Sequence, residues 1–421
     1  MRKLRIELVV VGALAAACGA KGGSIHFTAS GESLAQTSIG YDFPPANAGD
    51  PIFYDGWEVK FSEMIVTFDK VTMSENPDMS ANDQSQTGPA VAQLIGPWAV
   101  DLAKGGTVTG KSGAPELAAD IEAITGENLK GNASFDPSKR YAFGFDAVPA
   151  SASAKIVNLD AQGKTDYQTM QQNGWVVFYK GTATWKGLHS GGPSACPVGN
   201  AGDGTCCYQS DNGSATPYDF DANLPKVVTF AFGFTTPTSY VNCQNPDNDP
   251  AKPLSDAEEH ERGVQVKSNQ STIAQVTFHT DHPFWESFKH DTPAHFDQLA
   301  ARAVKQADGS YLVQLSDMKG VDYQSFTDSQ GRALPWRICA PIGADVNNLA
   351  DGAYGFAKPS SATATNMSFD SQFANITENP SGDPKQYMRD YYDYMLYDQS
   401  TQGHLNADGL CYVQRHYDSP N

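Results

Sequence analysis

The stretch that decides the fold class is Trp57-Glu58-Val59-Lys60-Phe61, followed closely by Met64-Ile65-Val66-Thr67-Phe68-Asp69-Lys70-Val71-Thr72-Met73. Apolar and polar residues alternate along it, which is typical of β-strands that bury one face. Similar runs recur at residues 140–148, 175–185, 226–234 and 263–279, with turn-forming Gly, Pro, Asn, Asp and Ser between them. We therefore predict a mainly β protein: one or two antiparallel β-sandwiches with a few short helices and long disulfide-stapled loops.

Three segments favour helices within this strand-rich pattern. Residues 115–124 begin with a proline, which suits the first helical position. Residues 293–305 follow Asp291, a side chain that can cap a helix, and residues 384–399 carry four crowded tyrosines. The cysteine distribution predicts an N-terminal β domain at 51–188 that lacks cysteines, and a disulfide-containing β-rich domain at 189–421.

The first 18 residues have the order of an export signal. Basic residues at 2, 3 and 5 precede an apolar run from Leu8 to Ala17, which is shorter than the ~20 residues that span a bilayer. A cysteine placed directly after three alanines resembles a bacterial lipoprotein signal. That resemblance implies a signal peptide at 1–17, a lipid on Cys18 and a lipidated tether with a first strand at 18–50. We expect an exported, membrane-anchored protein of the cell envelope, in the outer membrane, facing the periplasm or the surface. An ordinary secretory signal with an incidental cysteine is the alternative.

The chain is strongly acidic. Its net charge is −19, and residues 1–17 carry +2, so the chain from Cys18 onward carries −21. Such a protein repels phosphate backbones, which argues against nucleic acid as a partner and in favour of cations. Residues 105–112 match the G-x-x-x-x-G-K-S pattern of nucleotide-binding loops, but Gly113 and Pro115 interrupt the helix that must follow. We therefore expect no nucleotide.

Six cysteines remain once Cys18 is assigned to lipid. An even number in an exported protein predicts three disulfides, with 15 possible pairings that the sequence leaves open. A thiolate metal site is the alternative, but the spacing of these cysteines does not match zinc ligands. The six residues are Cys196, Cys206, Cys207, Cys243, Cys339 and Cys411.

Four of the nine histidines fall within 17 residues, around the end of a predicted strand. A strand end, a turn and the start of the next helix can converge on one point. Neutral imidazoles with a carboxylate form a suitable set for zinc or copper. We select as candidate metal ligands His279, Asp281, His282 and His295, with His290 in reserve. Asp281 can instead orient an imidazole from the second layer. The alternative is structural: histidines that cap the helix and satisfy backbone groups.

Other patterns point less clearly to chemistry. Residues 247–249 and 406–409 have the oxygen-rich look of calcium loops, but neither ends in the bidentate glutamate of that pattern, so calcium is the weaker candidate. The chain has no G-x-S-x-G and no H-E-x-x-H motif. The sequence therefore singles out no catalytic residue.

Several stretches resemble a group of uncharacterised predicted bacterial lipoproteins. The likeness covers most of the chain after Cys18 and implies no particular activity. The strand pattern after Trp57 also has a distant likeness to sandwich domains of exported copper-associated proteins, which assigns no residue. The stretches are 41–45, 55–59, 96–102, 243–250, 275–300 and 390–406.

These observations lead to one functional hypothesis and two alternatives. We expect a lipid-anchored binding module for a divalent transition metal, held by the His/Asp cluster. The first alternative is a surface protein that binds a glycan or another envelope protein without metal. The second is an exported hydrolase in which the same cluster holds a metal that activates water.

Overall fold

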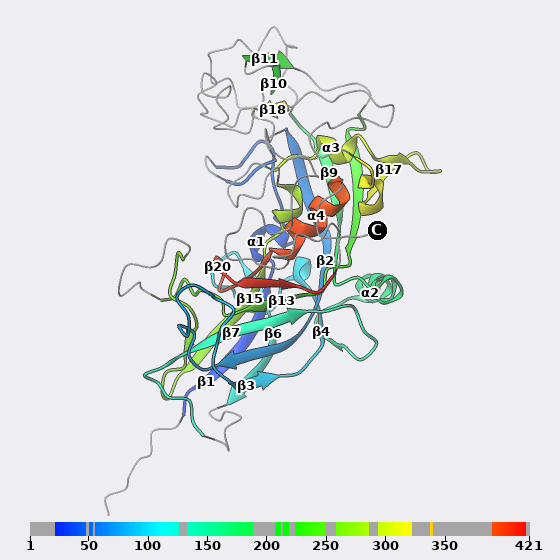
Figure 1. The fold of residues 1–421 in the computed structure, drawn as a ribbon. Coiled ribbons are helices and arrows are strands. Elements are labelled where there is room, and N and C mark those ends of the chain that lie inside the picture. The colour runs from blue at the N-terminus through cyan, green and yellow to red at the C-terminus, as the bar shows by residue number, and fades with distance from the viewer. Residues whose placement is uncertain are drawn as a thin grey trace, which may run out of the picture.

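The computed structural model describes residues 22–47, 50–53, 55–125, 133–187, 207–211, 214–218, 224–248, 258–285, 294–321, 337–339 and 390–417. Strand β2 (Trp57–Ser74) runs through the middle of the molecule (Figure 1). The two predicted strands are thus a single strand. Its ladder with the neighbouring strand β9 (Val177–Trp185) shifts register between Phe61 and Glu63, which is why the apolar alternation breaks there.

The largest sheet has twelve strands, and β2 and β9 lie at its centre. Most of its pairs are antiparallel; β12 with β17 and β4 with β8 are parallel. The path of the sheet is β16 (Val304–Lys305), β17 (Tyr311–Gln314), β12 (Val227–Phe234), β9, β2, β7 (Arg140–Ala147), β13 (Thr238–Val241) and β21 (Tyr412–Arg415), with β3 (Ala90–Leu94), β4 (Trp98–Asp101), β8 (Lys155–Ile156) and β14 (Val264–Gln265) off this path.

The remaining strands of the described residues form two further sheets. The six-stranded sheet has the order β20 (Gly409–Leu410), β19 (Gly403–Leu405), β15 (Ser271–Phe278), β1 (Ser24–Ser30), β6 (Leu117–Thr125) and β5 (Val108–Thr109). The three-stranded sheet has the order β11 (Ser214–Tyr218), β10 (Cys207–Asp211) and β18 (Arg337–Cys339), and lies at the opposite end of the molecule from β1 and β3 (Figure 1).

In the described part of the chain, helices are few and mostly short. They are α1 (Glu32–Ala35), α2 (Ala161–Asn173), α3 (Asp297–Ala300) and α4 (Tyr391–Ser400), with the 3-10 turns η1 (Leu102–Lys104), η3 (His282–Phe284) and η4 (Leu315–Met318). Helix α2 packs Tyr167 and Met170 against Ile65 of β2, on the face that is turned away from the main core. This cover explains why the middle of β2 is buried on both faces. The prediction of a mainly β protein with few helices is confirmed.

The two larger sheets share one hydrophobic core. Phe27 of the six-stranded sheet stacks on Phe143 of the twelve-stranded sheet with ring centroids 6.1 Å apart, and Phe278 meets Phe145 edge to face at 5.7 Å. The strand pairs β1 with β15, β9 with β12 and β7 with β13 all cross the expected domain boundary at 188/189. Residues from both sides of that boundary therefore build the same sheets and the same core.

The prediction of a helix at 115–124 was wrong. These residues form strand β6, which pairs antiparallel with β1 from Ser24 to Ala29. Helix propensity is a weak local preference, and the backbone hydrogen bonds offered by β1 outweigh it. The described part of the segment at 293–305 contains only α3 and then β16. Helix α4 overlaps the expected helical region at 384–399 and ends one residue beyond it.

One disulfide is described, between Cys243 and Cys411. It joins the end of β13 to the start of β21, where Val241 and Tyr412 are cross-strand partners. Cys207 and Cys339 are backbone partners in the β10–β18 ladder. Cys18, Cys196 and Cys206 lie outside the described residues. The described residues thus include a disulfide of the kind that the even cysteine count predicted.

Candidate metal centre

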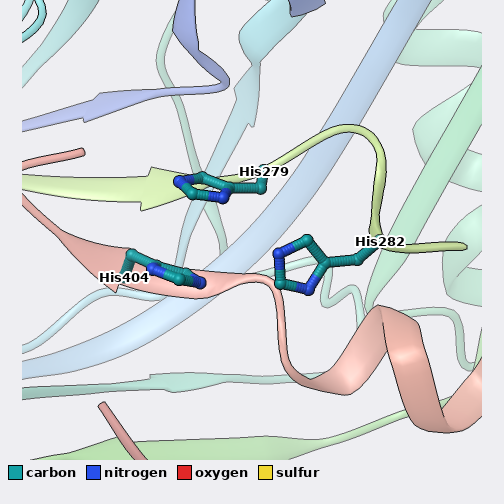
Figure 2. A group of neighbouring side chains, drawn as sticks. All are labelled: His279, His282 and His404. Atoms are coloured by element: carbon teal, nitrogen blue, oxygen red, sulfur yellow. The ribbon is translucent and has the colours of Figure 1, made fainter. Parts of the chain in front are cut away.

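Strand register brings two histidines together from distant parts of the chain. His404 of β19 stands opposite Thr277 of β15. His279 comes two residues after Thr277, so both imidazoles project from the same face of the sheet. The backbone pairing continues past the strand end, because the His279 N–H donates to Gln402 O at 3.0 Å. The rings of His279 and His404 consequently lie one over the other (Figure 2).

His282 reaches this pair from the turn after β15. It opens η3, where Pro283 follows directly, and its side chain is fully buried. Its ring stacks on Trp285 with centroids 3.9 Å apart, and the Trp285 side chain hydrogen-bonds to Asp281. The indole thus covers one face of the His282 ring. The edge of the His282 ring faces the other two histidines (Figure 2).

The three imidazoles can hold a metal ion. One ring nitrogen of each lies within 4.8 Å of the others. The ring of His282 is nearly perpendicular to the rings of His279 and His404, with centroids at 5.3 and 5.5 Å. Three imidazole nitrogens at bond lengths of ~2.0–2.1 Å are a common zinc donor set and also suit copper.

The rings of His279 and His404 are not yet aimed at one point. Their centroids lie 4.0 Å apart and their planes differ by only 14°. Nitrogen lone pairs lie in the ring plane, so two stacked rings direct them along nearly parallel lines. A shared ion therefore requires at least one of these two rings to turn about its Cβ–Cγ bond.

A second group of oxygen atoms lies close to one nitrogen of His279. The Nε2 atom of His279 is 3.2 Å from Ala407 O, 3.7 Å from Glu32 Oε1 and 4.0 Å from Asp408 Oδ1. Glu32 and Ala407 both have positive φ angles, of 60° and 74°, which residues other than glycine seldom adopt. Such strained positions tend to occur at functional sites.

The electrostatic surroundings of His279 favour a cation. Burial raises the pKa of the Glu32 carboxyl; His279 opposes this shift, and Asp408 adds to it. Burial likewise raises the pKa of Asp281, and His279 again opposes the shift. Both shifts arise mainly from burial, which disfavours the charged form of each carboxyl. A positive ion bound nearby would oppose them.

The other sequence-selected residues are placed differently. Asp281 lies beside the cluster, where its side chain hydrogen-bonds to Trp285, and it belongs to neither potential metal group of the described residues. His295 is buried, and its backbone N–H donates to Phe284 O, but its ring belongs to neither potential metal group of the described residues. His290 lies outside the described residues.

His404 was not among the candidate ligands selected from the sequence. It lies 125 residues after His279, and only the antiparallel pairing of β15 with β19 brings the two together. The sequence beside His404 indicates only a turn, because residues 406–409 are typical of the loop of a β-hairpin. The same turn meets the other oxygen-rich segment, because Asn406 Nδ2 donates to Asp247 Oδ2 at 3.1 Å.

Within the described ranges, no helix is long and apolar enough to cross a membrane. No protein-family model matches the sequence, and no curated protein or solved structure is significantly similar to it. The likeness to predicted lipoproteins therefore stays a prediction, and the chemistry of the residues is the basis for inferring function.

Proposed function

We propose that this protein is a lipid-anchored binding module of the cell envelope that holds a divalent transition metal, zinc or copper, through His279, His282 and His404. The observation that carries the proposal is the convergence of three ring nitrogens within 4.8 Å, from two segments of the chain. The acidic residues beside His279 support it, because they favour a positive ion at this place.

The burial of the site fits a role in binding a metal ion better than a role in catalysis. The side chains of His282 and His404 are 0% and 2% exposed. A hydrolytic metal needs an open coordination position that both water and substrate reach. Two of the three donors instead lie inside the protein, which supports a site that holds its ion.

The first experiment is elemental analysis of the full chain, purified in detergent after exposure to zinc or copper. We expect about one equivalent of metal in the parent and a large loss in His404→Ala. His26→Ala is the matched control, because His26 lies on β1 of the same sheet, where it contacts Asp120 and not the cluster. A parent without metal, or an equal loss in both variants, would contradict the proposal.

The anchor is proposed from the sequence of residues 1–18. The disulfide between Cys243 and Cys411 supports an oxidising compartment, where such bonds persist. The test is metabolic labelling with a radioactive fatty acid, followed by membrane fractionation. The parent should carry label in the outer-membrane fraction, whereas Cys18→Ser should lose it and become soluble. Label that persists in Cys18→Ser would exclude this residue as the lipid site.

A further inference from the structure

The C-terminal end of helix α4 contacts the proposed metal centre through one hydroxyl. Thr401 follows the last residue of α4 and is buried. Its Oγ1 atom lies 2.7 Å from His282 Nδ1 and 2.8 Å from the carbonyl oxygen of Asp398. Both distances are those of good hydrogen bonds.

Only one arrangement of protons satisfies both contacts. The carbonyl of Asp398 can only accept, so the single hydroxyl proton of Thr401 points at it. The oxygen of Thr401 must then accept from His282, which places a proton on Nδ1. A neutral imidazole with a proton on Nδ1 carries its lone pair on Nε2. The helix end thereby selects which nitrogen of His282 can bind a metal.

We propose that Thr401 is a positioning residue that holds His282 in the Nδ1–H tautomer, so that Nε2 serves as the metal ligand. The identity of the bound species rests on the proposed function, whereas the tautomer does not. Histidine ligands in proteins almost always donate their second ring N–H to a hydrogen-bond acceptor, and loss of that acceptor typically weakens metal binding 10- to 100-fold.

The orientation of the ring is fixed from two directions. The Thr401 hydroxyl holds one edge of the His282 imidazole, and the indole of Trp285 covers one face at 3.9 Å. Pro283 directly after His282 restricts the backbone of the same turn. His282 is thus held in place, whereas at least one ring of the His279–His404 pair must turn before the two can share an ion. We infer that His282 is the preset ligand of the three.

The test compares Thr401→Val, which keeps the shape and removes the hydroxyl, with Thr401→Ser, which keeps the hydroxyl. Thr236→Val is the matched control, because Thr236 is buried and bonds to Gln399 of α4 without contacting His282. For zinc alone, competition titration with a chromogenic chelator should show binding weakened about 10- to 100-fold in Thr401→Val. Thr401→Ser and Thr236→Val should keep the parent affinity.

A second measurement needs no metal. Nitrogen-15 NMR of histidine-labelled full chain, with His282→Ala to assign the signals, reports which ring nitrogen carries the proton. We expect Nδ1–H in the parent and in Thr401→Ser, and a shift toward Nε2–H in Thr401→Val. An Nε2–H tautomer in the parent would overturn the inference, as would unchanged zinc affinity in Thr401→Val. If the parent binds no zinc but shows the expected tautomers, the positioning role stands and the proposed function fails.

Discussion

The imidazole rings of His279 and His404 stack on each other, with centroids 4.0 Å apart and planes 14° from parallel. This contact joins the end of β15 to the C-terminal hairpin formed by β19 and β20. It gives His404 two separable roles: an aromatic ring that packs and a nitrogen that can bind metal. Aromatic pairs of this kind contribute roughly 0.5–1.5 kcal/mol beyond their area burial.

Variants of His404 should separate the two roles. His404→Phe keeps a flat ring over His279 but has no ligand nitrogen, so we expect it to lose bound metal and to keep most of the parent stability. His404→Ala should lose the metal and also about 2 kcal/mol or more of stability, because it removes the stack and opens a cavity. Elemental analysis and urea unfolding measure the two effects. Metal retained in His404→Phe would exclude this residue as a ligand.

Asp408 should speed the arrival of the metal ion. Its side chain is 72% exposed, and its carboxylate lies 4.0 Å from His279 Nε2, so it presents negative charge at the outer edge of the cluster. We expect Asp408→Asn to slow zinc association several-fold at low salt and to change affinity little. Asp308→Asn removes the same charge from an exposed turn and is the control. Stopped-flow measurements that show equal association rates for the two variants would contradict this role.

Glu63 should make stability depend on pH. Burial and a hydrogen bond from its carboxyl to Asp166 raise the pKa of Glu63 to about 8. Between pH 4.5 and pH 8 the unfolded chain gives up this proton while the folded chain keeps it. Glu63 therefore contributes to a loss of stability as pH rises through this window, and its contribution is constant above it.

Glu63→Gln should remove that contribution, because glutamine stays neutral and can still donate to Asp166. Urea unfolding at about pH 5 and about pH 9 measures the change for parent and variant. We expect the free energy of unfolding to fall less over this range in the variant. Asp166 does not contribute to the difference between about pH 5 and about pH 9. Because its pKa is lowered, its contribution to stability is lost only as pH falls into the acidic range. Parallel pH profiles for parent and variant would refute the raised pKa of Glu63.

The disulfide between Cys243 and Cys411 should contribute strongly to stability. It closes a loop between residues 168 positions apart, and long loops lose the most freedom in the unfolded chain. We expect the double variant Cys243→Ala/Cys411→Ala to be less stable by roughly 2–5 kcal/mol in urea unfolding. The parent with this bond reduced should unfold at a similar urea concentration. Equal stability of the double variant and the oxidised parent would show that the bond constrains little.

The sequence by itself determined the class of the fold and two members of the candidate site. Alternation along β2 is a local property of the chain, and burial of one strand face follows from it directly. His279 and His282 are three residues apart across a strand end, so their proximity is also local. The even cysteine count predicted disulfides as well, because that prediction requires no knowledge of which cysteines pair.

Only the tertiary structure decided the rest. His404 joins the cluster because β19 pairs with β15 in one register, and a shift of one residue would point its ring to the other face. Thr401 reaches His282 because α4 ends beside η3. Residues 117–125 form a strand because β1 supplies backbone partners. In each case the deciding contact comes from a segment far away in the chain, and a local pattern contains no information about which distant segment will pair with it.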